Sequence, residues 1–407
     1  MKIIYPTSKK LQKLFERKFI NRRLQEKVKK IVEDVRLFGD EALIKYTKKF
    51  DRVKLSLKQL RVSDIEISAA YQSSSSNFVK HLKIVIDNIS RFYRKQLKKS
   101  WRIKADDGIW IAEKYQSLER IGIYIPAGSA PLISTVYMTV IPAKIAGVKE
   151  IVIVSPPNIK GEIDPYILMV ADLLKVNEIY RIGGAQAIAA LAFGTKTIRK
   201  VDKIFGPGNI YVTEAKRQVF GYVDVDMLAG PTELVIIANR FSNTDFIVAD
   251  LKAQAEHKEG LCILITNSRK KALEVKAKME GYSGYIVLTK NIEQAIEIAN
   301  RLSPEHLELL IKNPLRWFKK ITNSSAVFLG QFSPVAVGDY IAGPSHVLPT
   351  YGTAKFFSGI NLVDFMKSIH VINYSKKGLE KVVDTVEKIA SLEGMQQHLN
   401  SIKIRIT

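Results

Sequence analysis

Cysteine is nearly absent from this sequence: Cys262 is the only one among 407 residues. A single cysteine excludes a disulfide framework within the chain and fits a reducing compartment. It stands in the apolar run 261–265, so we expect it to be a buried strand residue. Apolar and charged residues make up 46% and 25% of the chain, which is ordinary for a soluble globular protein with two or three domains.

The chain also lacks a long uninterrupted apolar segment. Residues 121–143 carry no charged side chain, but Pro126, Gly128, Pro131 and Pro142 interrupt them. Because proline breaks helical hydrogen bonding, we expect a buried strand, a turn and a small-residue helix rather than a membrane span. The N-terminal sequence MKIIYPTSKKLQKLF has no apolar core of the kind that a secretory signal needs. We therefore expect a cytoplasmic protein with no membrane partner.

Acidic residues are few relative to basic ones: 40 Asp and Glu stand against 63 Lys and Arg, a net charge of +23. Such an excess indicates nucleic-acid binding when it gathers in one patch or tail. Here it is spread in ones and twos along amphipathic segments such as 9–30 and 92–104, and no nucleic-acid motif accompanies it. We interpret it as a solvated basic face, with attraction of anionic ligands as the second interpretation. No nucleic-acid partner is expected.

The order of apolar residues predicts an α/β protein. Residues 1–115 have mostly helical spacing, with amphipathic segments at 24–50 and 78–101. Strand-like apolar runs then alternate with small-residue helices, and the turns between them carry glycines, as at 183–184 and 206–209. This alternation predicts a largely parallel sheet. In such sheets ligands bind beyond the carboxyl ends of the strands.

A second α/β run follows over residues 233–302, and residues 331–351 form a long loop rich in Gly and Pro. Long loops of this kind tend to be functional. The last forty residues hold a strand at 369–372 and a helix at 377–392. The predicted fold class is α/β: two Rossmann-like domains with incomplete, parallel sheets, plus a small N-terminal helical segment and a C-terminal extension.

The stretch Ser303-Pro304-Glu305-His306 predicts the start of a helix, with Ser303 as N-cap and Pro304 at the first helical position. Glu305 and His306 would then lie in the first turn, where the helix dipole favours a carboxylate and disfavours an imidazolium. The pattern thus predicts an ionised Glu305 beside a neutral His306, as a base-catalysed reaction requires. The alternative is a carboxylate that only complements the dipole, beside an idle surface histidine.

Histidine is also scarce, with six in the chain. His81 and His370 fit surface or structural positions. The other four each lie near a carboxylate or an amide, in the pairs Gln254–His257, Glu305–His306, Asp339–His346 and Glu393–His398.

Several of these pairs suit metal binding. Gln254 and His257 are three residues apart and share one helix face. Asp339 begins a Gly- and Pro-rich loop that can hold a carboxylate stiffly. A helix that ends at Gly394 can let Glu393 and His398 reach one site. Two imidazoles, one carboxylate and one amide oxygen suit zinc or a neighbouring divalent ion, with positions left for substrate. An ordinary surface or capping role is the alternative for each pair.

Eight motifs that follow one another in order give the chain a resemblance to a known family, from about residue 20 to 400. They are IGIYIPAGSAPLISTVYMTVIPAKIAGV at 121–148, GGAQAIAALAFGT at 183–195, FGPGNIYVTEAKRQV at 205–219, MLAGPTE at 227–233, QAEH at 254–257, SPEHLEL at 303–309, GDYIAGPSHVLPTYGTA at 338–354 and SLEGMQQH at 391–398. With these motifs the chain resembles histidinol dehydrogenase.

The resemblance implies that L-histidinol is oxidised to L-histidine through the aldehyde, with two NAD reduced in succession at one site, as the last steps of histidine biosynthesis. It also implies one zinc ion per subunit and an intertwined homodimer that shares its active site, because the C-terminal ligand comes from the partner subunit. Residue by residue, it makes the zinc ligands Gln254, His257, Asp339 and His398. It makes Glu305 and His306 the acid/base pair. It makes the NAD contacts Tyr124, Gln186 and Asn209. Beside the zinc ligands and His306, it makes the substrate pocket Thr232, His346 and Glu393.

Three positions depart from the pattern of the family. Thr232 stands where Ser is usual, Ser345 where Asn is usual, and Ala127 where a second Gly is usual. Threonine keeps the hydroxyl, whereas the other two can alter a pocket wall or a phosphate-binding turn. One alternative is therefore a related zinc- and NAD-dependent alcohol dehydrogenase with another small alcohol as substrate. The other is an inactive basic binding protein, against which the intact polar residues argue.

The expected domains are as follows. An N-terminal helical arm spans 1–20. A first, discontinuous α/β domain spans 21–123 and 234–360 and carries most metal and catalytic residues. A second α/β domain at 124–233 binds NAD, and a C-terminal dimerisation extension spans 361–407.

Overall fold

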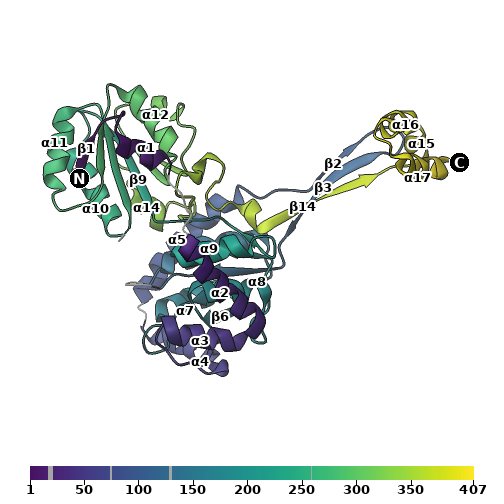
Figure 1. Cartoon of the computed structure of the whole chain (residues 1–407), viewed down its shortest axis with the longest axis horizontal. Helices are drawn as coiled ribbons and strands as arrows, with labels where there is room; N and C mark the ends of the chain where they lie inside the picture. Colours follow the sequence, from purple (N-terminus) through teal and green to yellow (C-terminus); the bar gives the residue numbers. More distant parts are fainter. Residues whose placement is uncertain (17–21, 74–75, 128–130, 258) are drawn as a thin grey trace.

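The computed structural model describes residues 1–16, 22–73, 76–127, 131–257 and 259–407. Two parallel sheets with helices on their faces form the body, and a three-stranded antiparallel ribbon extends from it to a cluster of helices at the C-terminus (Figure 1). This arrangement confirms the predicted fold class of two incomplete Rossmann-like sheets with extensions. Within the described ranges no helix is both long and apolar enough to cross a membrane.

The first sheet, called sheet A here, has six strands that all pair in parallel. Their order across the sheet is β1 (Lys2–Ile4), β11 (Tyr285–Leu288), β10 (Leu261–Thr266), β9 (Glu233–Ala238), β12 (His306–Leu310) and β13 (Ala326–Leu329). Most central strand residues are buried and aliphatic, as expected for a parallel sheet covered on both faces. One face packs against α10 (Thr244–Ala255) and α11 (Arg269–Lys278), and the other against α1 (Lys9–Phe15) and α12 (Ile292–Leu302).

The second sheet, called sheet B, has five parallel strands. Their order is β6 (Glu178–Arg181), β5 (Glu150–Ser155), β4 (Arg120–Tyr124), β7 (Lys203–Phe205) and β8 (Asp224–Val225). One face packs against α2 (Arg22–Phe38), α3 (Asp40–Phe50), α8 (Gly184–Phe193) and α9 (Ile210–Val219). The other packs against α4 (Asp64–Ala70), α5 (Ser76–Arg94), α6 (Ile133–Ala146) and α7 (Pro165–Leu173).

This packing differs from the expected grouping of residues 21–123 with 234–360. The helices of residues 22–94 bury their apolar faces against sheet B and its helices, not against sheet A. The reason is that α2 and α5 complete the two helical layers of sheet B, which the helices after its own strands cover only in part. The N-terminal residues 1–16 belong instead to sheet A, where β1 pairs with β11. The rest of the expected arm, 17–20, lies outside the described residues.

The ribbon joins distant parts of the sequence. It consists of β2 (Trp101–Lys104), β3 (Trp110–Ser117) and β14 (Met366–Asn373), and at its tip lie α15 (Lys376–Glu380), α16 (Val383–Leu392) and α17 (Gln396–Ile406) (Figure 1). At its root the Phe365 ring stacks on the Phe205 ring of sheet B, with centroids 4.2 Å apart. The strand expected at 369–372 is confirmed. The helix expected to reach residue 101 ends at Arg94, and Trp101 begins a strand.

The helix start predicted at Ser303 is wrong. Helix α12 ends at Leu302, and Ser303 is its C-cap in the left-handed region, with φ +47°. Pro304 and Glu305 lead directly into β12, which begins at His306. Proline is common both just after a helix and at its first position, so the sequence signal can mark either end.

Several other boundaries differ from the expectations. The long segment 24–50 is two helices separated at Gly39, and the loop expected at 331–351 contains the short helix α14 (Val335–Tyr340). Gly128 of the expected turn after β4 lies outside the described residues. The remaining helix of sheet A is α13 (Pro314–Phe318).

Candidate active site

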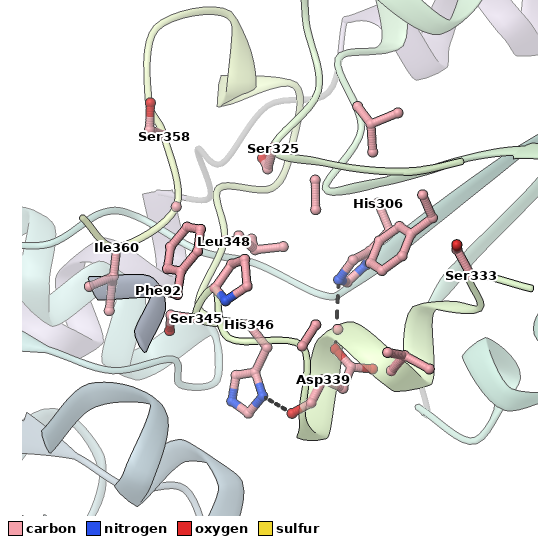
Figure 2. Close-up of a pocket in the computed structure, with 18 of the residues that line it drawn as sticks. Phe92, His306, Ser325, Ser333, Asp339, Ser345, His346, Leu348, Ser358 and Ile360 are labelled. Carbon is pink, nitrogen blue, oxygen red and sulfur yellow. Dashed lines mark hydrogen bonds and ion pairs between the residues drawn. The ribbon is translucent and has the colours of Figure 1, made fainter. Parts of the chain in front are cut away.

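A cleft of about 720 Å³ lies between the sheet A unit and the helices of sheet B. Its wall includes His306 at the start of β12, Asp339 in α14, and Ser345 and His346 in the loop that follows. Phe92 of α5 contributes from the sheet B side. Figure 2 shows the His306 ring directed toward α14, with the His346 ring on the other side of the Asp339 backbone. The cleft therefore gathers two of the imidazoles and one of the carboxylates that the sequence singled out.

The His306 ring is held in one tautomer. Its Nδ1 lies 3.1 Å from the backbone oxygen of Glu233, and a carbonyl oxygen can only accept, so Nδ1 carries the proton. Nε2 then has the free lone pair, and it lies 3.8 Å from Oδ1 of Asp339 at the wall of the cleft. This arrangement makes Nε2 the basic atom of the site.

Burial lowers the pKa of His306 below its usual value, against a smaller raising effect from the charge of Asp339. The side chain is only 5% exposed. The predicted neutral imidazole is therefore confirmed in direction, but the predicted cause is wrong. No helix begins at this residue, and the ring is neutral because an imidazolium would lose its hydration.

Glu305 differs from the predicted ionised state. Its carboxyl is buried, and burial raises its pKa to about 8. Two bonds oppose that shift in part: the N–H of Glu233 donates to Oε2 over 2.8 Å, and the Thr232 hydroxyl bonds to the same carboxyl group. Oε2 also lies 3.4 Å from Nδ1 of His306. At neutral pH Glu305 is therefore mostly protonated and can exchange its proton.

His346 links the two walls of the cleft. Its Nδ1–H donates to the backbone oxygen of Asp339 over 2.9 Å, and Nε2 lies 3.3 Å from the Thr135 hydroxyl of α6. Because a carbonyl fixes the proton on Nδ1, the Thr135 hydroxyl is the donor to Nε2. Burial lowers the pKa of His346 to about 4.

This burial predicts the titration of His346 in the metal-free protein. A ring whose charged form is disfavoured stays neutral as the pH falls, so His346 should remain uncharged at pH 5.5, about one unit below an ordinary imidazole. Chemical shifts of ¹³C-labelled histidine, recorded between pH 8 and 4, measure this directly. The resonance that disappears in His346→Gln identifies the ring, and a midpoint at or above 6.5 would contradict the expectation.

The four residues predicted as zinc ligands are not all brought together within one chain. Gln254 is buried in the last turn of α10 and donates its amide N–H to the Thr232 hydroxyl over 3.3 Å, which leaves its oxygen as the atom able to ligate. His257 acts electrostatically on His306, Asp339 and His346, so it lies near these three side chains, although it does not itself line the cleft. In the described part of the chain no cluster of three or more His, Cys, Asp or Glu can hold a metal ion.

The two C-terminal candidates lie elsewhere. His398 is in α17 and Glu393 caps α16, so both sit at the far tip of the ribbon, away from the cleft (Figure 1). Both are exposed to solvent. Helix α16 does end just before Gly394, whose φ is +70°, as the sequence indicates. Glu393 and His398 are thus close in sequence but reach no other candidate ligand of their own chain.

The predicted NAD contacts follow the strands of sheet B. Tyr124 ends β4, Gln186 lies in the first turn of α8, and Asn209 is the N-cap of α9, where its side chain accepts from two backbone N–H groups. Tyr124 and Gln186 are only 3% and 1% exposed, and the Tyr124 hydroxyl accepts from the N–H of Gly184 over 3.1 Å. Only Asn209 of the three is open to solvent.

The candidate site residues lie at opposite ends of the strands in the two sheets. The candidate NAD residues lie at the carboxyl ends of the strands of sheet B, as expected for an open parallel sheet. In sheet A, however, Glu233 and His306 are the first residues of β9 and β12, so the site lies at the amino ends. Helix α10 follows β9 and runs back, which brings Gln254 to the same edge. For sheet A the expectation from the sequence is wrong.

Some residues of the site were not singled out from the sequence. Thr135 lies in a helix with no other marked residue, and Glu233 takes part through its backbone oxygen. Tyr93 of α5 is fully buried, donates to the oxygen of Ile360 and accepts from the N–H of Ser345. It thereby anchors the loop that carries His346. Thr135 and Glu233 do stand in quoted motifs, at 121–148 and 227–233, so membership of those motifs was the one available signal, and Tyr93 had none.

Two parallel α/β units on either side of a cleft, with a buried carboxyl and a tautomerically fixed imidazole in its wall, define an α/β enzyme equipped for proton transfer. Comparison with known proteins gives the family. The model of the family described as histidinol dehydrogenase matches residues 16–406. The chain belongs to the histidinol dehydrogenase family, and it is an NAD-dependent oxidoreductase.

Individual relatives agree over nearly the whole length. The chain is similar to histidinol dehydrogenase from Clostridium acetobutylicum, with 45% identity over 95% of this chain and 93% of the relative. Identity with histidinol dehydrogenase from Carboxydothermus hydrogenoformans is 44% over 100% of both chains. The crystal structure of histidinol dehydrogenase from Elizabethkingia anophelis has a TM-score of 0.92 at 38% identity, and covers 100% of this chain and 98% of that one.

Proposed function

We propose that the chain oxidises L-histidinol to L-histidine through the aldehyde, with two NAD reduced in succession. The observation that carries the proposal is the His306 ring, whose Nδ1–H is bound to a backbone carbonyl so that its neutral Nε2 faces the cleft. Glu305 lies against the other side of the same ring. A base and an exchangeable acid side by side suit two consecutive oxidations at one site.

The donor set of this chain fits a zinc ion once it is completed by a second copy. An amide oxygen of Gln254, the His257 imidazole and the Asp339 carboxylate are suitable ligands, and Glu305 and Thr232 connect to Gln254 behind them. His398 is too far along the ribbon to join them in its own chain. We therefore propose a homodimer in which His398 and Glu393 of one chain reach the cleft of the other, with one zinc per subunit.

The first oxidation uses His306. Nε2 accepts the hydroxyl proton of the substrate as the carbon–hydrogen bond breaks, because its lone pair is free and its pKa is kept low by burial. NAD, when bound along the carboxyl edge of sheet B near Tyr124, Gln186 and Asn209, supplies the hydride acceptor. The bound zinc supplies a template and a Lewis acid for the imidazole and amine of the substrate.

The second oxidation starts from the hydrated aldehyde, so a water must first be added to the aldehyde, which is a role for Glu305. Its carboxyl has a pKa of about 8, close enough to neutral for it to take up and return a proton during attack of water. His346 and Thr232 line the substrate side: the first is bound to Thr135 and the backbone of Asp339, the second to Gln254.

The three departures from the family pattern bear on the substrate rather than on the reaction. Thr232 retains the hydroxyl that bonds to Glu305, and Ser345 is buried with its N–H on Tyr93 and its hydroxyl on the N–H of Val347. Ala127 forms a bridge with Pro131 beyond β4. None of them removes an acid, a base or a ligand. The chain has a single cysteine and hence no disulfide of its own, which supports our proposal that the protein works in the cytoplasm.

Formation of NADH from a panel of alcohols tests the proposal. We expect L-histidinol to be turned over with a kcat/KM at least roughly two orders of magnitude above that of simple aliphatic amino alcohols, because its imidazole adds ligand and hydrogen-bond contacts. A better rate with another alcohol would favour the related dehydrogenase. Absence of NADH, together with anion binding that weakens steeply with salt, would favour a basic binding protein.

A further inference from the structure

A second pair of acidic side chains lies directly behind the active site. Glu308 is in the centre of β12, fully buried, two residues after His306 and therefore on the same face of the strand. Asp250 lies in α10, one helical turn before Gln254. The pair thus joins the strand that begins with the base to the helix that ends with a candidate metal ligand, and the proposed mechanism uses neither residue.

The contacts of Glu308 reach a third element. Oε1 accepts from the N–H of Val335, the first residue of α14, over 3.0 Å. Oε2 is buried, and in the described residues it accepts from no N–H or O–H group. The Asp250 carboxyl lies within hydrogen-bonding reach of the Glu308 side chain.

Two carboxyl groups in contact disfavour double ionisation, and Glu308 is fully buried whereas Asp250 is partly exposed, so the shared proton belongs on Glu308. Burial, and then the charge of Asp250, raise the pKa of Glu308 to about 9. A protonated Glu308 can donate to the Asp250 carboxylate, which gives Oε2 a partner and leaves Oε1 free to accept from Val335.

We propose that Glu308 and Asp250 are positioning residues: a carboxyl pair that shares one proton and holds α10 and α14 against β12. Helix α14 carries Asp339 as its fifth residue, and α10 carries Gln254. The far end of α14 is fixed by packing, because a Cβ on Gly338 would lie 2.7 Å from the Phe328 ring of β13. Loss of the Glu308 contact would therefore free the start of α14 and let Asp339 move relative to His306.

The expected effect on the metal ligands rests on the proposed function, because it assumes the zinc site. The test itself uses no alcohol substrate. Full-length, metal-free protein is titrated with Zn²⁺ in competition with a chromogenic chelator, and deuterium exchange of the segment 335–340 is followed in the same samples. Glu308→Gln keeps both contacts, since its amide oxygen can accept from Val335 and its amide N–H can donate to Asp250. Glu308→Leu keeps the volume but removes both.

We expect Glu308→Gln to bind Zn²⁺ within about twofold of wild type and Glu308→Leu to bind about tenfold or more weakly, as is usual when a residue that orients a ligand is lost. Exchange of residues 335–340 should be faster only in Glu308→Leu. Leu309→Ala is the matched control, because Leu309 is buried in the same strand but packs on the opposite face beneath α12. It should lower the melting temperature without changing zinc affinity.

Equal zinc affinity in Glu308→Leu and wild type would overturn the proposal, as would an equal loss in Leu309→Ala. A Glu308→Gln variant as weak as Glu308→Leu would overturn the shared proton, since the amide reproduces the neutral pair. Wild-type protein that binds no zinc would overturn the proposed metal centre itself. The exchange rates of α14 would then decide by themselves whether the carboxyl pair holds that helix.

Discussion

Replacement of His306 by Asn is expected to lower kcat for L-histidinol oxidation by roughly two to four orders of magnitude, the usual contribution of a general base. Asn keeps a side-chain N–H for the backbone oxygen of Glu233 but has no basic nitrogen at the position of Nε2. The substitution should therefore remove proton transfer while the cleft keeps its shape. Steady-state kinetics with L-histidinol and NAD measure the loss, which we expect in kcat with little change in KM.

The control for this variant is Ser358→Ala, which changes another residue of the cleft wall that is distant from the His306 ring in Figure 2. It should retain near wild-type kcat. A His306→Asn enzyme that kept more than about a tenth of the wild-type kcat would rule out Nε2 as the general base.

Glu305→Gln separates the two steps: it should slow oxidation of the aldehyde more than oxidation of the alcohol.

The second large effect concerns the ribbon. His257→Asn and His398→Asn should each be inactive, because each removes one ligand from every site of the dimer. When the two proteins are mixed and their subunits exchange, half of the dimers contain one chain of each kind. In such a dimer one site carries both lesions and the other carries none, so random exchange should restore about a quarter of the wild-type specific activity.

The structural basis is the position of His398 at the tip of an exposed ribbon, where it meets no other candidate ligand of its own chain. Activity is measured as NADH formation after exchange has been verified by native mass spectrometry with one mass-labelled subunit. Mixing His257→Asn with Asp339→Asn is the matched control, since each of these residues lies at or near the cleft of its own chain and every site of a mixed dimer therefore keeps one lesion. Verified exchange without recovery in the first mixture would exclude a site built from two chains.

Much of sheet B could be predicted from the sequence. Glycines within 183–184 and 206–209 marked the turns between strands and helices. A Cβ at these glycines would clash with neighbouring atoms, or the backbone has a positive φ that other residues rarely adopt. The Gly206 case is clear: its φ is +107°, and a Cβ there would lie 2.1 Å from the oxygen of Tyr124. Local backbone geometry of this kind leaves a direct trace in the sequence.

The surroundings of His306 could not be predicted in the same way. Ser303-Pro304 fits both the start and the end of a helix, and only the pairing of β12 with β9 and β13 decides between them. The same long-range pairing buries Glu305, which reverses its expected ionisation. His306 is neutral as expected, but through burial and not through a helix dipole, so agreement in the result concealed an error in the cause.

Contacts between distant segments left no trace in local patterns. The bond from Thr135 to His346 spans 211 residues, and the link from Glu308 to α14 involves a strand residue that looks like an ordinary neighbour of apolar positions. The predicted ligands Gln254, His257 and Asp339 gather at the amino edge of sheet A, which the general rule for open sheets does not anticipate. The expected dimer follows from the resemblance. The position of His398 at the tip of the ribbon agrees with it, because there the residue can reach a metal site only in another chain.

The most direct test of the proposed function is the stoichiometry of the completed reaction. Purified protein is incubated with limiting L-histidinol and excess NAD, and NADH and L-histidine are quantified at the end point. We expect about two NADH and one L-histidine per L-histidinol, with both lost after treatment with a chelator and restored by Zn²⁺. One NADH per substrate with the aldehyde as product, or full turnover without metal, would contradict it.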